Sequence, residues 1–236
     1  MAEKKAPEPF DGFREEASSF FWELAFHNER PWFLAHKEEF QTLIQRPFRA
    51  LAEETQAILE QRQTGQEWML HVSRIYRDAR RLHGRGPYKD HLWFTLNRRA
   101  EAESGPSFWF EIGGAGYGYG MGYYTVTAAQ MERFRTAAGA DPGELETLVK
   151  RFGEQDRFSL DGEAYKRARV HVSEALDPWL NRRWIGLSRH KDFGGELLTP
   201  ELPQILAEDF MWLMPYYEYF SGFYDPDAER RAMLRK

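Results

Sequence analysis

The chain has 236 residues, a formal net charge of −5 and no cysteine. The missing thiols exclude disulfides, cysteine metal ligands and cysteine nucleophiles, and the acidic balance argues against nucleic-acid binding over the whole surface. Aromatic residues make up 16% of the chain. Because each aromatic side chain buries roughly 150–250 Å², we expect these residues to dominate the core.

Both ends of the sequence are polar. Residues 1–9, MAEKKAPEP, lack the apolar core of a signal peptide and are expected to form a flexible tail. Residues 10–224 are expected to form a single domain, and residues 225–236 a charged C-terminal tail. No apolar run approaches the roughly 20 residues that a membrane-spanning helix needs. We therefore expect a cytoplasmic protein with no membrane partner.

Helical spacing dominates the first quarter of the chain. An amphipathic helix is predicted over residues 13–28 from the apolar positions Phe13, Ala17, Phe20, Phe21 and Leu24. A second helix is expected to begin at Pro31, since proline suits a first helical turn. Pro47 is expected to interrupt or restart it, and a third helical stretch follows through Leu51 and Leu59.

The apolar period then changes to two, which indicates strands. The first three are expected at WMLHVSRIY, HLWFTLN and SFWFEI, which are residues 68–76, 91–97 and 107–112. Arg74 shares the parity of Trp68 and Val72. We therefore expect Arg74 to enter the core side of the sheet, where a guanidinium needs a partner.

A fourth strand is expected at residues 113–124, GGAGYGYGMGYY. Glycines occupy one parity of this segment and large side chains the other, so the strand should have one bare face and one aromatic face. A bare face lets a helix, another backbone, a ring or a ligand approach closely. The glycines match neither a dinucleotide-binding fingerprint nor a P-loop.

The second half of the chain returns to helices. Thr127 and Gln130 have the spacing of a capping box, which predicts a helix over residues 128–138. Further elements are expected as a short helix after Pro142-Gly143, late strands at 157–161 and 183–189, and a long helix from Thr199-Pro200. This order predicts an α+β fold, with a central antiparallel sheet and N-terminal and C-terminal helices packed on it.

Residues 74–91, RIYRDARRLHGRGPYKDH, gather six Arg and Lys residues against two Asp residues. Surface ion pairs would explain little, since each is worth roughly 0–1 kcal/mol. Two cations about 4 Å apart repel by about 4 kcal/mol at an effective dielectric near 20, so the cluster favours a bound anion. Because the arginine fork suits phosphate or carboxylate, we predict an anion site formed by Arg74, Arg77, Arg80, Lys89 and His91.

The pattern RIYRD-x-R…PYK-x-H, together with FFWELAFHNERPWFLAHKEEF at 20–40 and Arg-Pro-Phe at 46–48, resembles the domain-of-unknown-function 2461 family. The resemblance implies a bacterial source but carries no established activity. Within these motifs we expect five residues to support the site, namely Asn28, Trp32, Lys37, Asp78 and Tyr88. Core packing is an alternative role for Trp32.

The sequence departs from the family's pattern in the basic loop. Leu82, Gly84 and Gly86 stand where the family has Ser, Asp and Thr, and His27 replaces the first Asn. Any family role that needs those hydroxyl or carboxylate groups is therefore in question here.

Other chemistries have little support. The histidines lack metal-ligand spacing and no serine has a nucleophile-elbow context, so we expect neither a metal nor a cofactor. If a reaction occurs, His91 or Asp78 is the acid–base candidate.

Three functions fit these residues. The first is binding of a phosphate- or carboxylate-bearing small molecule, with or without catalysis. The second is a module for single-stranded nucleic acid, with exposed aromatic residues beside the basic loop. The third is a scaffold protein whose arginines form structural ion pairs. The oligomeric state stays open.

Overall fold

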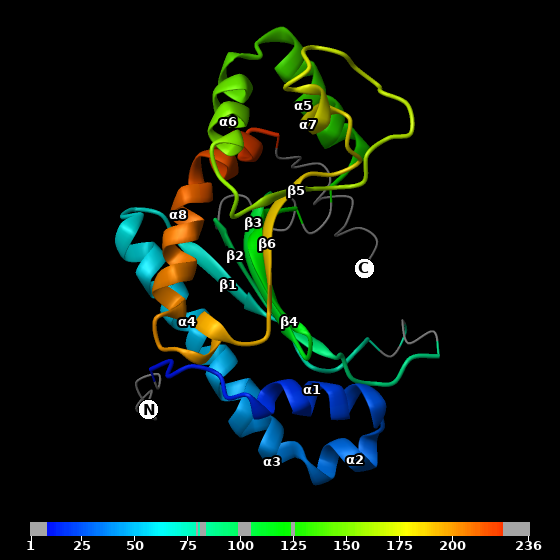
Figure 1. The fold of residues 1–236 in the computed structure, drawn as a ribbon, viewed down its shortest axis with the longest axis vertical. Helices are drawn as coiled ribbons and strands as arrows, with labels where there is room; N and C mark the ends of the chain where they lie inside the picture. Colours follow the sequence, from blue (N-terminus) through cyan, green and yellow to red (C-terminus); the bar gives the residue numbers. More distant parts are fainter. Residues whose placement is uncertain (1–8, 79, 81–83, 99–104, 124–125, 224–236) are drawn as a thin grey trace. The chain divides into compact units, whose positions relative to one another are not determined.

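The computed structural model describes residues 9–78, 80, 84–98, 105–123 and 126–223 (Figure 1). The first helical elements are α1 (Glu16–Phe26), α2 (Arg30–Ala35), α3 (Lys37–Phe40), the π-helical turn η1 (Gln41–Gln45) and α4 (Arg46–Arg62). The strands are β1 (Trp68–Val72), β2 (His91–Arg98), β3 (Ser107–Gly113), β4 (Gly116–Gly122), β5 (Ser159–Asp161) and β6 (Gly186–Asp192). The later helices are α5 (Ala128–Ala140), α6 (Gly143–Gly153), α7 (Asp177–Leu180), the 3-10 turn η3 (Gly195–Leu198) and α8 (Leu202–Ser221).

The strands form one six-stranded sheet in the order β1-β2-β3-β4-β6-β5. The short strand β5 pairs antiparallel with β6, with Ser159 opposite Ser188. Helices precede and follow the sheet strands along the chain, so the predicted α+β class is confirmed. Among the described helices, none combines the length and apolar character needed to span a membrane.

Contacts divide the chain into two compact units. The first unit consists of Met1–Leu96, Phe110–Tyr119 and His190–Asp209, and the second of Asn97–Trp109, Gly120–Arg189 and Phe210–Lys236. The expected single domain over residues 10–224 stays a prediction. The expected tails lie almost wholly outside the described residues.

The core of the first unit is built largely from aromatic rings. The predicted stripe of the first helix is buried, at Phe13, Ala17, Phe20, Phe21 and Leu24. Pro47 lies in the first turn of α4, where a proline can restart a helix. Next to it, the ring centroid of Phe48 lies 5.8 Å from that of Phe94 and 6.1 Å from that of Phe110. These contacts pack α4 against β2 and β3.

β4 has the two faces that its alternating sequence predicts. Tyr117, Tyr119 and Met121 are all buried. The glycines allow the neighbouring strand β6 to come close, because a Cβ atom on Gly116 would lie 2.1 Å from the Lys191 carbonyl oxygen. A larger residue at Gly116 would therefore force the two backbones apart.

Arg74 corrects one expectation, because its side chain is exposed rather than on the core side. The period-two pattern changes at Ser73, which is buried. The Ser73 amide donates to the Trp93 carbonyl at 2.8 Å, and its hydroxyl accepts from the Trp93 amide at 2.9 Å. Ser73 thereby turns inward after the end of β1, so the next residue points to solvent.

The second unit contains α5, α6, α7, β5 and the C-terminal part of α8. The predicted capping box is present, with Thr127 and Gln130 each accepting from the other's backbone amide. The ring of Phe134 on α5 lies 5.3 Å from that of Phe220 on α8. α8 begins at Leu202, shortly after the predicted start, and contains Pro215 within the helix.

Candidate functional site

The first unit contains a cavity of about 730 Å³ at the turn between β3 and β4. Its walls come from α1, the first residues of β2, the end of β3, the start of β4 and the end of β6. Cavities of roughly 300–1,000 Å³ are typical of small-molecule sites. Trp22, with 59% of its surface exposed, lies on one wall, and His91, Glu111 and Lys191 lie on others.

The glycine-rich turn lets α1 come close to the sheet. A Cβ atom on Gly114 would lie 2.9 Å from the indole nitrogen of Trp22. The hydroxyl of Ser18, one turn earlier on α1, donates to the Gly114 carbonyl at 2.7 Å. The bare glycine therefore accommodates an aromatic ring, which is the close approach that its sequence indicates.

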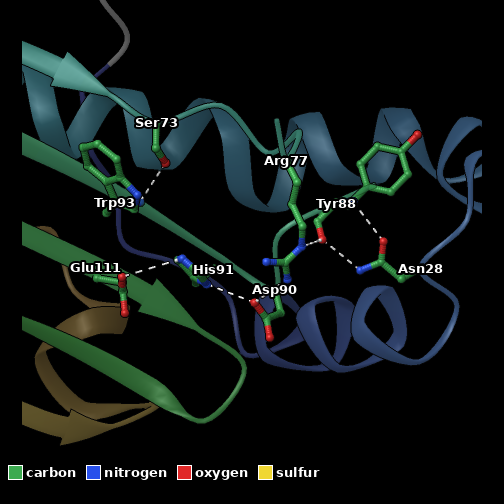
Figure 2. Close-up of polar contacts among 8 residues, drawn as sticks. All are labelled: Asn28, Ser73, Arg77, Tyr88, Asp90, His91, Trp93 and Glu111. Atoms are coloured by element: carbon green, nitrogen blue, oxygen red, sulfur yellow. Dashed lines mark hydrogen bonds and ion pairs between the residues drawn. The ribbon is translucent and has the colours of Figure 1, made fainter. Parts of the chain in front are cut away.

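His91 lies between two carboxylates at the cavity wall (Figure 2). Its Nδ1 is 2.9 Å from the Asp90 carboxylate, and its Nε2 is 3.8 Å from the Glu111 carboxylate. Partial burial raises the pKa of Asp90, but the hydrogen bond with His91 and the charges of His91 and Arg77 outweigh it, so the pKa is lowered overall. Asp90 is thus held ionised and can fix the orientation of the His91 ring.

Arg77 links the Asp90 carboxylate to the backbone of Tyr88. Its Nη2 is 3.3 Å from the Asp90 carboxylate, and its Nε donates to the Tyr88 carbonyl at 2.7 Å. Tyr76 and Tyr88 form an antiparallel bridge. The described parts of the basic stretch are therefore paired as the two arms of a hairpin, and the Arg77 guanidinium bonds one arm to the other.

Asn28 holds the same hairpin from the other side (Figure 2). Its side-chain amide donates to the Tyr88 carbonyl and accepts from the Tyr88 amide, both at 2.9 Å. The Tyr88 ring is buried and stacks on Phe33 of α2 with centroids 4.1 Å apart. Asn28 and Tyr88 thus anchor the segment that leads into Asp90 and His91.

The other predicted anion-binding residues do not gather in the cavity. Arg74 is exposed, and Arg80, whose side chain is 88% exposed, forms a two-bond ion pair with Asp78 at 2.9 and 3.1 Å. Lys89 lies over the Trp93 ring at 5.6 Å. Burial, followed by the charge of Arg77, lowers the pKa of Lys89. Of the five predicted residues, His91 is the one that lines the cavity.

Two predicted supporting residues lie elsewhere on the helices. Trp32 is half-buried and stacks on His36 with centroids 4.1 Å apart, and Lys37 is exposed on α3. In the basic loop, Gly84 has a φ of 78°, a conformation that suits glycine. A Cβ atom on Gly86 would lie 2.3 Å from the Asn28 side-chain oxygen. Leu82 lies outside the described residues.

Sequence reasoning missed several cavity residues, among them Trp22, Glu111, His190 and Lys191. The ammonium of Lys191 contacts the Glu196 carboxylate, which also accepts from the Tyr117 hydroxyl at 3.0 Å. The alternation of β3 could have placed Glu111 on the open face, but its pairing with His91 depends on the strand order. Among the described residues, no group of three or more His, Asp or Glu side chains is arranged to hold a metal ion.

A family model described as "Conserved hypothetical protein (DUF2461)" matches residues 16–219. The match covers well over half of the chain and includes both motifs, at residues 20–48 and 74–91. The chain therefore belongs to this family. A search of curated proteins found no match.

Proposed function

We propose that this member of the family binds a phosphate- or carboxylate-bearing small molecule in the cavity at the β3–β4 turn, where His91 exchanges a proton with it. The observation that carries the proposal is the position of His91, at the cavity wall and in contact with Asp90 and Glu111. A histidine oriented by carboxylates and open to a cavity is a common arrangement for an acid–base group.

The proposal moves the anion site from the basic loop to the cavity. Arg74, Arg77, Arg80 and Lys89 do not line the cavity, so a ligand bound there would find its donors on other residues. The cavity offers Lys191 and His190 at the end of β6 and His91 at the start of β2. A ligand that spans these two strands would bring its anionic group to cationic or N–H donors.

Arg77 becomes a positioning residue under this proposal. It contacts Asp90, and Asp90 contacts the His91 ring. The indole of Trp22 supplies a flat apolar surface on the same cavity. The ligand class that fits best is therefore a small molecule with a ring or other flat apolar part and one anionic group.

A binding panel tests the proposal. Inorganic phosphate, sugar phosphates, nucleotides and dicarboxylates would be screened by thermal shift against the wild type and His91→Gln. His71→Gln is the matched control, because His71 is an exposed histidine on the neighbouring strand β1. A ligand at about 100 times its Kd adds about 2.7 kcal/mol, which for a chain of this size is roughly 5–10 °C in Tm.

We expect one ligand class to raise the Tm of the wild type and of His71→Gln, with the shift reduced or lost in His91→Gln. A ligand that binds both histidine variants as tightly as the wild type would contradict the proposed role of His91. A panel without any shift would contradict the proposed function as a whole.

A further inference from the structure

A second group of arginines surrounds a single aromatic ring in the second unit. The guanidinium carbons of Arg169, Arg135 and Arg183 lie 4.3, 5.3 and 5.6 Å from the centroid of the Tyr165 ring. We refer to these four residues as the Tyr165 cluster. Each contact is a favourable cation–π interaction, but three cations around one ring also repel one another.

Within the Tyr165 cluster, Arg135 is buried and bonded to the backbone. Its side chain is 5% exposed, and its Nε and Nη2 donate to the carbonyls of Leu180 and Arg182, both at 2.8 Å. The Tyr165 amide donates to the Asn181 carbonyl at 2.9 Å, next to the antiparallel bridge between Ala164 and Arg182. The ring and one of its three cations are therefore held by backbone contacts.

The loop that carries Arg169 is also ordered by specific bonds. In Figure 1 this loop is the long yellow segment between β5 and α7. The Asn181 side-chain oxygen accepts from the amides of Arg169 and Val170 at 2.6 and 3.2 Å, and its side-chain nitrogen donates to the Val170 carbonyl at 2.9 Å. Arg169 is thus presented from a constrained backbone rather than from a free chain.

The positive charge of the Tyr165 cluster is only partly offset. Glu132 pairs with Arg135 and Glu163 with Arg183, both at 3.3 Å, and both carboxylates are 66% exposed. Arg169 forms no ion pair with any carboxylate of the described residues. The sequence adds Lys166 and Arg167 beside it, and residues 164–173 contain no Asp or Glu. This is a preorganised surface with unbalanced positive charge.

We propose that the Tyr165 cluster binds a phosphate group. The exposed guanidiniums of Arg169 and Arg183 lie beside the same ring, and arginine forks suit an oxyanion with three acceptor oxygens and up to two charges. The anion would relieve the repulsion among the guanidiniums, which the two exposed carboxylates do only in part. The same chemistry fits the phosphate of a small molecule and the backbone of a polynucleotide. The inference does not depend on the cavity of the first unit.

The test uses the full chain and two probes, inorganic pyrophosphate followed by calorimetry and a labelled short oligothymidylate followed by fluorescence anisotropy. The variants are Arg169→Gln and Arg183→Gln, which change exposed side chains. Arg49→Gln is the matched control, since Arg49 is an exposed arginine paired with Glu53 in the first unit. Circular dichroism melts establish that each variant is folded.

We expect at least one probe to bind, with affinity reduced roughly tenfold to a hundredfold in each cluster variant and nearly unchanged in Arg49→Gln. Binding of pyrophosphate would assign the site to small-molecule phosphates. Binding of the oligonucleotide alone, with affinity that falls steeply with salt, would assign it to a polynucleotide backbone. Absence of binding by both probes, or equal affinity in wild type and cluster variants, would overturn the proposal.

Discussion

The basic hairpin, whose two arms meet at the bridge between Tyr76 and Tyr88, and the Tyr165 cluster are both rich in arginine, but they use it differently. In the hairpin, Arg77 bonds to Asp90 and to a backbone carbonyl, and Arg80 forms a two-bond pair with Asp78. In the Tyr165 cluster, three guanidiniums share one ring, and Arg169 pairs with no described carboxylate. The two regions are therefore similarly rich in arginine, but Arg77 and Arg80 are paired with carboxylates in the hairpin, whereas the positive charge of the Tyr165 cluster is only partly paired.

The difference shows why charge density along the sequence is a weak guide to an anion site. The hairpin has more cations in a shorter segment, yet its chain reversal brings Asp90 and the Tyr88 carbonyl to Arg77. The Tyr165 cluster draws its cations from α5, from a long loop and from the segment before β6. Cations that fold together from distant segments can be left with too few acids, and such a surface favours an external anion.

The largest expected effect concerns the packing of Asn28 against the hairpin. Gly86→Thr restores the family's residue but places its Cβ atom 2.3 Å from the Asn28 side-chain oxygen and 2.5 Å from the Asn28 carbonyl. The clash should break the two bonds between Asn28 and Tyr88, at a cost of about 3 kcal/mol in the free energy of unfolding. Urea unfolding followed by circular dichroism measures this cost.

Gly84→Ala is the control for this prediction. A Cβ atom on Gly84 would meet no described atom within 4 Å beyond its own chain neighbours, so the variant adds no clash. Its positive φ should cost about 1 kcal/mol. Gly86 is not among the glycines with a positive φ, so equal losses in the two variants would contradict the predicted cost of the clash with Asn28.

The second prediction compares one arginine from each region. Arg77→Ala should lower the free energy of unfolding by about 2 kcal/mol, because it removes a charged bond to the Tyr88 carbonyl and leaves Asp90 without its arginine. Arg169→Ala should cost less than about 1 kcal/mol, because an exposed cation–π contact is weak. Thermal unfolding of the two variants without ligand measures both changes in the free energy of unfolding. If the Arg169 variant lost as much as the Arg77 variant, Arg169 would be a structural residue and the contrast between the regions would fail.

Much of the fold could be predicted because it depends on local pattern. The buried stripe from Phe13 to Leu24 follows helical spacing, and the capping box of α5 needs only Thr127 and Gln130. β2 follows period two, with Leu92, Phe94 and Leu96 buried. The error at Arg74 arose because β1 ends at Val72 and the next residue, Ser73, is buried, so the period-two pattern does not continue to Arg74.

The candidate sites were harder to predict because their residues meet only in the folded chain. His91 was found in the basic stretch, but its partner Glu111 lies on the next strand and depends on the order of β2 and β3. Trp22 reaches the cavity because Gly114 has no side chain, which no helical period reveals. The Tyr165 cluster lies partly in a loop without apolar period, so its convergence had no signal in the sequence.

The smallest predicted effect tests whether crowding of cations costs stability in the hairpin. Burial and the charge of Arg77 lower the pKa of Lys89 below its ordinary value of 10.5. Between the lowered pKa and 10.5 the unfolded chain binds more protons than the folded one, so the contribution of Lys89 to stability should rise with pH across this window. Below this window the charge of Lys89 lowers the free energy of unfolding. Lys89→Met should therefore stabilise the protein at pH 7, by at most about 0.5 kcal/mol because the side chain is partly exposed. Urea unfolding at pH 7 and above pH 10.5, with exposed Lys37→Met as control, measures the gain and its disappearance. A gain of the same size at both pH values would show that added apolar packing, rather than relief of charge, is responsible.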